Sequence, residues 1–291
     1  MVAKTTKSFL IAIVGETASG KSSLALELAE CYNGEIIAAD SRTVYKGMDI
    51  GTAKPSREDQ ARVPHHLLDI STPDMPISAA IFQQRAHKII DDIAGRGKTP
   101  FLVGGTGLYI DAILYDFTFH GQADTRERQA LQQLSVDELQ QRLHDENIPL
   151  PQNYKNPRHL IRQLETRGMH GERHTLRPNT MVFGLTVDPE KRKVRIAERV
   201  ADMMQQGLKE EARRLFNTYG EQCPALQTIG YQEFVPYFHD IGTLEEVQQR
   251  IVRHTLAYAR RQRTWFRRNK DIHWICKKEE VDVLITTELN K

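Results

Sequence analysis

The sequence is poor in cysteine and carries almost no net charge. The first shortage argues against disulfide-rich and zinc-binding proteins, and the second against a uniformly basic or acidic surface. Its 291 residues include only three cysteines, Cys31, Cys223 and Cys276, which lie far apart and form no CxxC pair. This usage argues against a disulfide framework or a zinc knuckle and fits a reducing, cytosolic compartment. The formal net charge is only +2, so a polyanionic partner would need a local basic patch.

Long apolar runs, internal repeats and low-complexity stretches are also missing. The apolar run at residues 9–14 ends at Gly15 and is too short for a signal-sequence core or a membrane span. We therefore expect a cytoplasmic protein with no membrane partner. A hydrophobic content of 40% and a charged content of 27% are ordinary for a globular protein.

Short apolar runs alternate with helical patterns in the first hundred residues. Buried strands are predicted at 9–14, 35–39 and 99–103, and helices at 22–32 and 77–94. This alternation predicts an α/β fold, a parallel sheet of the phosphate-binding-loop (P-loop) type flanked by helices. The strands lead into Gly15, Asp40 and Gly104, which should meet at the sheet edge where such folds bind ligands.

The composition changes near residue 115. Residues 120–175 are polar, rich in Gln, Arg and His, and poor in strand signals. We therefore predict a small helical insertion domain at residues 115–175 within a core formed by residues 1–114 and 176–291. Other predicted elements are helices at 137–146, 157–167, 190–206, 208–219 and 244–268, and a strand at 181–187.

A phosphate-binding loop is predicted where the first strand gives way to the first helix. Eight residues fit the pattern GxxxxGK[ST]: Gly15, Glu16, Thr17, Ala18, Ser19, Gly20, Lys21 and Ser22. Backbone N–H groups and the helix N-terminus favour phosphate oxygens, Lys21 adds a charge, and Ser22 could ligate Mg²⁺. An ordinary glycine-rich turn is the alternative, but the strand before the loop and the helix after it are the context that the motif requires.

Two further loops are candidates for the same site. Asp40 could be a Mg²⁺ ligand, a general base, or simply a turn cap followed by Ser41. The glycines at 104, 105 and 107 permit close approach of a ligand, and the Thr106 hydroxyl could bond a phosphate oxygen; a strand-to-helix turn without a ligand is the alternative.

A strongly basic stretch lies near the C-terminus. Residues 250–270 contain eight Lys or Arg and no Asp or Glu, and residues 260–268 interleave arginines with Trp265 and Phe266. Guanidinium groups beside aromatic rings suit RNA phosphates with stacked bases. A solvated helical face with buried aromatics is the alternative, but such local asymmetry in a nearly neutral chain favours a polyanion site.

Taken together, these segments resemble the tRNA dimethylallyltransferases, also called tRNA isopentenyltransferases, of bacterial type. The resemblance extends over about residues 9–268, and the stretch 40–55 is too long a match to arise by chance. The matching segments are residues 15–22, 40–55, 64–69, 103–109, 229–231 and 261–267.

The resemblance implies transfer of a dimethylallyl group from dimethylallyl diphosphate to the exocyclic amine of the adenosine 3′ of the anticodon in tRNA, with release of diphosphate. It implies Mg²⁺ as cofactor and the anticodon stem-loop as RNA partner, and we expect a monomer. Asp40 would be the base, and the catalytic group would comprise Asp40, Thr17, Lys21, Ser22 and Thr106. Residues implied to contact tRNA are Asp40, Ser41, Arg42, Thr43, Arg158, His159, Arg162, Arg261, Gln262, Arg263 and Trp265.

The sequence departs from the family pattern in two loop positions, where Glu16 replaces a common Pro and Ser22 replaces the commoner Thr. Three rival functions share some of the same residues. A small kinase would use the loop for ATP but leaves the basic helix unexplained. A transferase acting on free adenine nucleotides would need neither the basic helix nor the insertion. A nucleotide-gated RNA-binding protein would bind RNA without forming a prenylated product.

Overall fold

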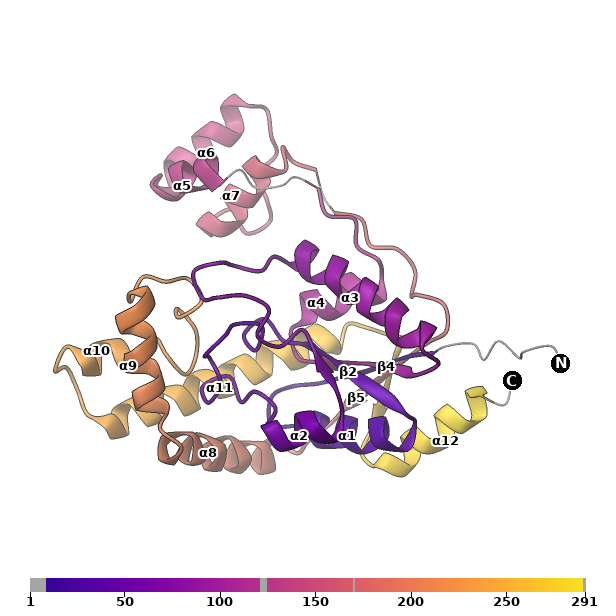
Figure 1. Ribbon diagram of the computed structural model, residues 1–291. Helices are drawn as coiled ribbons and strands as arrows, with labels where there is room; N and C mark the ends of the chain where they lie inside the picture. The colour runs from indigo at the N-terminus through magenta and orange to yellow at the C-terminus, as the bar shows by residue number, and fades with distance from the viewer. Residues whose placement is uncertain (1–8, 121–124, 170, 290–291) are drawn as a thin grey trace. The chain divides into compact units, whose positions relative to one another are not determined.

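A six-stranded, all-parallel sheet forms the centre of the computed structural model, which describes residues 9–120, 125–169 and 171–289 (Figure 1). The strand order is β3-β2-β4-β1-β5-β6. This architecture confirms the predicted α/β class. The strands are β1 (Leu10–Val14), β2 (Gly34–Ala39), β3 (His65–His66), β4 (Thr99–Gly104), β5 (Thr180–Leu185) and β6 (Ile272–Ile275).

Helices flank this sheet. In Figure 1, α3 and α4 lie on one side of the strands and α1 and α12 on the other. The helices are α1 (Lys21–Cys31), α2 (Arg57–Arg62), α3 (Ala79–Gly95), α4 (Gly107–Leu114), α5 (Thr125–Gln132), α6 (Val136–Asp145), α7 (Pro157–Glu165), α8 (Pro189–Gln205), α9 (Leu208–Tyr219), α10 (Phe234–Phe238), α11 (Leu244–Phe266) and α12 (Lys278–Leu289). None of the helices in the described ranges has the length and apolar character needed to cross a membrane.

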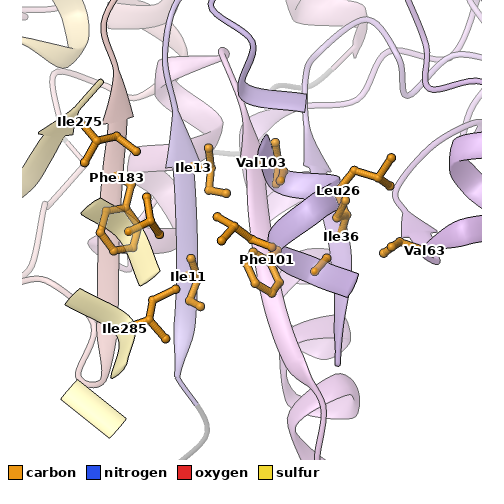
Figure 2. Packing of buried hydrophobic residues seen from close by; sticks show 14 residues of the cluster. Ile11, Ile13, Leu26, Ile36, Val63, Phe101, Val103, Phe183, Ile275 and Ile285 are labelled. Atoms are coloured by element: carbon orange, nitrogen blue, oxygen red, sulfur yellow. The ribbon is translucent and has the colours of Figure 1, made fainter. Parts of the chain in front are cut away.

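The main core lies between one face of the sheet and helices α1 and α12. Every residue of β1 and β2 is buried, as expected for strands covered on both faces. Ile11 and Ile13 of β1 join Phe101 of β4, Phe183 of β5 and Ile285 of α12 in a single apolar cluster (Figure 2). This packing fixes the strand ends and therefore the loops that follow them.

The chain separates into two compact units, Met1–Leu114 with Leu176–Lys291 and Tyr115–Thr175. The second unit is helical and has its own small core, with Leu131, Leu139, Leu143 and Leu160 fully buried. Helix α6 begins with a capping box in which Ser135 and Glu138 satisfy each other's backbone N–H groups.

Candidate active site

The phosphate-binding loop occupies the turn between β1 and α1. Gly20 caps α1 with a φ of 92°, a left-handed conformation that favours glycine. The first N–H groups of α1 have no partner within the helix, so they and the helix dipole favour an anion at this point. The loop therefore has the backbone form that the motif predicts.

The loop opens into a cavity of about 620 Å³ that brings the predicted catalytic side chains together. Thr17, Lys21 and Ser22 line it, and so does Asp40, which follows the last residue of β2. The hydroxyl oxygens of Ser19 and Thr43 are buried on this cavity and have no hydrogen-bond partner within the described ranges. Buried hydroxyls without a partner are rare, and a polar ligand beside these two residues could supply the missing bonds.

Asp40 is held at the junction of this cavity with a second one of about 340 Å³. Its Oδ1 accepts a hydrogen bond from the Arg42 backbone N–H at 2.8 Å. The neighbouring Ser41 N–H donates to Thr106 Oγ1 at 3.0 Å, so the Gly104–Gly107 loop braces the Asp40 turn. The predicted role of Thr106 as a phosphate contact stays a prediction, whereas its bond to Ser41 is observed.

Burial and nearby charges shift the pKa values of two basic side chains in the site. Desolvation, followed by repulsion from Arg199, lowers the pKa of Lys21 to about 8, while Asp40 and Glu16 act in the opposite direction. Burial also lowers the pKa of Arg199, which Asp40 partly offsets. Arg199 Nη1 donates to Thr17 Oγ1 at 3.3 Å. Sequence reasoning missed Arg199, because an arginine in the middle of α8 resembles a solvated residue.

Tyr258 of α11 is a second residue that sequence reasoning missed. It lines both cavities together with Asp40. Burial and the Asp40 charge raise the pKa of its phenol, so the hydroxyl stays protonated at neutral pH and can donate a hydrogen bond. Nothing in the local pattern of α11 separates this tyrosine from one packed in a core.

Gln262 is predicted to contact RNA, and that role stays a prediction, while the structure shows both ends of its amide bonded within the protein. Its side chain is 5% exposed; Oε1 accepts from the Thr17 N–H at 2.8 Å, and Nε2 donates to the Gly105 carbonyl at 2.9 Å. Gln262 therefore ties the two glycine loops to α11 and presents no free amide to solvent.

Glu16 is one of the eight loop residues predicted to bind the diphosphate, which stays a prediction, and its side chain is engaged by another residue. It is buried, and its Oε1 pairs with Arg192 Nη1 of α8 at 2.5 Å. A carboxylate would repel a diphosphate, so its pairing with Arg192 removes an obstacle to anion binding in the loop. Only the backbone of residue 16 stays a candidate for phosphate contact.

One buried carboxylate fixes the segment that follows Asp40. Glu211 Oε2 accepts from the N–H groups of Asp49 and Ile50 at 3.1 and 3.0 Å. Its Oε1 accepts from the Gly51 N–H at 3.0 Å and from the Tyr231 hydroxyl at 2.8 Å. The segment held in this way continues into residues 52 and 53, which line both cavities.

The residues predicted to contact RNA belong to both units of the chain. In the main unit, Arg261 is exposed and lines the second cavity, together with Ser41 and Arg42. Arg263 lies on a different cavity, and Trp265, 40% exposed, donates from Nε1 to Asp111 Oδ2 at 2.9 Å. In the helical unit, Arg158 and His159 are exposed, whereas Arg162 pairs with Glu165 and donates to the His120 carbonyl.

The donors near the loop suit a magnesium ion that a substrate would help to bind. No group of three or more His, Cys, Asp or Glu side chains with metal-binding geometry occurs in the described part of the chain. Mg²⁺ commonly uses one or two protein oxygens together with substrate phosphates and waters. The exposed Ser22 hydroxyl at the start of α1, beside the phosphate loop, fits that mode.

Comparisons with known proteins agree with this arrangement. A family model described as IPP transferase matches residues 43–269. A tRNA dimethylallyltransferase of Anoxybacillus flavithermus is 41% identical over 278 residues, covering 91% of this chain and 89% of the relative. The corresponding enzyme of Bacillus subtilis is 38% identical over 294 residues, covering 96% and 94%.

Solved structures give the same result. The tRNA isopentenylpyrophosphate transferase of Bacillus halodurans superposes with a TM-score of 0.76 at 37% identity, covering 98% of this chain and 97% of that one. A eukaryotic dimethylallyltransferase acting on tRNA superposes with a TM-score of 0.78 at 27% identity, covering 92% and 74%.

Proposed function

The chain belongs to the IPP transferase family, and on that premise we propose that it transfers a dimethylallyl group from dimethylallyl diphosphate to tRNA. The acceptor is the exocyclic amine of the adenosine 3′ of the anticodon, and diphosphate is released. The observation that carries the proposal is the single cavity shared by the phosphate-binding loop and Asp40. An anion site and a carboxylate on one cavity are what this reaction requires.

The loop side of the cavity binds and activates the donor. The backbone N–H groups of residues 18 and 20–22, the Lys21 ammonium and the Ser19 hydroxyl would hold the diphosphate. Positive charge fixed at the leaving group stabilises the negative charge that develops on it. Mg²⁺ would be held by the Ser22 hydroxyl and the diphosphate oxygens, where it would neutralise further negative charge.

Asp40 serves the acceptor. Its second carboxylate oxygen, Oδ2, orients the adenine amine and takes one proton from it as the new bond forms. The amine nitrogen supplies the electron pair for the C–N bond to the first carbon of the allyl group. The C–O bond to the diphosphate breaks, and its electron pair leaves with the diphosphate. Removal of one carboxylate base should slow the reaction by about 10²–10⁴.

In this proposal the RNA is bound by α11, by the loop that follows β2 and by the helical insertion. Arg261, Ser41 and Arg42 surround the second cavity beside Asp40, which supports the entry of an extruded base at that point. Arg158, His159 and Arg162 on α7 would contact the anticodon stem-loop, and Arg263 and Trp265 would contact the RNA from α11. We propose that the protein acts as a monomer in the cytoplasm, where its tRNA substrate occurs.

One assay tests the activity directly. The protein is incubated with labelled dimethylallyl diphosphate, Mg²⁺ and unmodified tRNA, and the labelled nucleoside is mapped after digestion. The expected product is a prenylated adenosine next to the anticodon. Parallel reactions replace the donor with ATP or the tRNA with free AMP; phosphate transfer, or prenylation of AMP alone, would contradict the proposal.

A further inference from the structure

The loop between α9 and α10 forms part of the second cavity, the one of about 340 Å³ that also contains Asp40. All of residues 227–232 except Tyr231 line this cavity. Residues 220–233, all of which the structure describes, contain no helix or strand, so neither kind of backbone ladder fixes the loop. Its order must come from other contacts, and those contacts determine the shape of the cavity beside Asp40.

One buried carboxylate holds this loop. The Glu233 side chain is 1% exposed, and its Oε2 accepts a hydrogen bond from the Gly230 N–H at 2.9 Å. Its Oε1 accepts from His254 Nδ1 of α11 at 2.7 Å and from Gln232 Nε2 at 3.4 Å. A carboxylate can only accept, so the contact with His254 requires a proton on Nδ1. Glu233 therefore joins the loop that lines the cavity to the long helix α11.

The same loop packs backbone to backbone against the segment that follows Asp40. Gly230 has a φ of 97°, and a Cβ there would lie 3.0 Å from the Gly51 carbonyl oxygen. Gly51 belongs to the segment held by Glu211, which accepts its N–H at 3.0 Å. A Cβ at Gly51 would in turn lie 2.5 Å from the Tyr231 ring. Because only glycine fits at both points, no flexible side chain lies between the two segments to absorb a shift of the loop.

We propose that Glu233 and His254 are positioning residues for the acceptor adenosine, because they fix the loop that lines its cavity. The inference rests on the proposed function and adds two residues that act on the use of tRNA. In the described structure neither side chain lines the second cavity, so both act through Gly230 and Gln232. Residues 227–232 are also absent from the described lining of the first cavity, where the diphosphate would bind. Loss of the contact should therefore impair the use of tRNA and spare the donor.

The test determines KM for tRNA and KM for dimethylallyl diphosphate separately. Glu233→Gln turns one carboxylate oxygen into an NH₂ group, so either Gly230 or His254 loses its acceptor. This variant should raise KM for tRNA by roughly tenfold, with KM for the donor and the dissociation constant for pyrophosphate within about twofold of wild type. His254→Ala should act in the same direction. His254→Asn keeps an N–H donor close to the position of Nδ1 and should stay close to wild type.

Glu221→Gln is the matched control. Glu221 forms a similar contact with His239, at 2.9 Å, but in the described structure its carboxylate accepts from no residue of the loop. Both KM values of this variant should stay within about twofold of wild type. Thermal melting identifies any variant that does not fold, and His254, whose side chain is 40% exposed, keeps the test decisive if Glu233→Gln unfolds.

Three results would overturn the inference and leave wild-type prenylation intact. The first is a KM for tRNA within about twofold of wild type in the folded Glu233→Gln and His254→Ala variants. The second is an equal rise in both KM values, which would indicate a general loss of structure. The third is a His254→Asn variant that is no better than His254→Ala. A wild-type protein that forms no prenylated tRNA would overturn both the inference and the proposed function.

Discussion

Glu211 is the residue whose removal should most clearly separate positioning from chemistry. It touches neither cavity in the described structure, yet it accepts four hydrogen bonds that hold residues 49–51 and Tyr231. Thr52 and Ala53 follow directly and line both cavities. We expect Glu211→Gln to loosen residues 49–53 and to reduce prenyl transfer, because one carboxylate oxygen becomes an NH₂ group that cannot accept a hydrogen bond.

The magnitude follows from the bonds that are lost. Whichever oxygen is replaced, two donors lose their acceptor: either the Asp49 and Ile50 amides or the Gly51 amide and the Tyr231 hydroxyl. A hydrogen bond to a charged group contributes about 1.5–3 kcal/mol. Opening of the segment should therefore become easier by about 3–6 kcal/mol, an increase on the order of 10²–10⁴ in the open population.

Hydrogen exchange and kinetics measure this effect together. The amides of residues 49–51 should exchange faster in Glu211→Gln by about 10²–10⁴, and kcat/KM for tRNA should fall by roughly tenfold or more. Glu210→Gln is the control, since Glu210 is its neighbour on α9 and its side chain is 69% exposed. Equal exchange at residues 49–51 in the two variants would refute the reasoning.

Three further predictions follow from the same site. Arg192→Met leaves the Glu16 carboxylate buried without its partner and should lower the free energy of unfolding by about 3–5 kcal/mol. Adding Glu16→Gln should restore most of the lost stability, as measured by thermal melting. An unchanged melting temperature in the single variant would contradict the buried pair. Because the pKa of Lys21 is lowered to about 8, its positive charge is lost as the pH rises through 8, so pyrophosphate affinity of the free protein should fall there. In titration calorimetry, a Lys21→Arg variant should keep its pyrophosphate affinity through this pH range. The same fall of affinity with pH in the variant and the wild-type protein would contradict the assignment to Lys21. Gln262→Ala should weaken pyrophosphate binding by roughly two- to tenfold, with Thr264→Ala as an exposed control; a loss confined to tRNA binding would show that Gln262 contacts RNA instead.

Much of the fold was predictable because its signals are local. Continuous apolar runs indicated β1, β2 and β4, and the glycines at residues 15 and 20 marked the loop between β1 and α1. The two strands that the pattern did not reveal are the short ones. His65–His66 has no apolar signal, and Ile272–Ile275 is buried only at its two ends and follows a mostly charged stretch.

The parts of the site that were not predictable depend on contacts between distant segments. Arg199, Glu211 and Tyr258 lie within helices where polar residues usually face solvent, and only the packing of α8, α9 and α11 turns them inward. The same cause explains why the sequence did not reveal two contacts made by loop and helix residues. The Glu16 carboxylate finds Arg192 across 176 positions of sequence, and Gln262 reaches Thr17 across 245, distances at which no local pattern carries information.

The most direct measurement is the single-turnover rate of Asp40→Asn with saturating donor and tRNA. The asparagine keeps the acceptor for the Arg42 N–H but removes the basic oxygen. The account predicts prenyl transfer slower by about 10²–10⁴, with the dissociation constant for tRNA changed by less than about threefold. A rate equal to that of the wild-type protein would show that no proton passes to residue 40, and the proposed chemistry would be wrong.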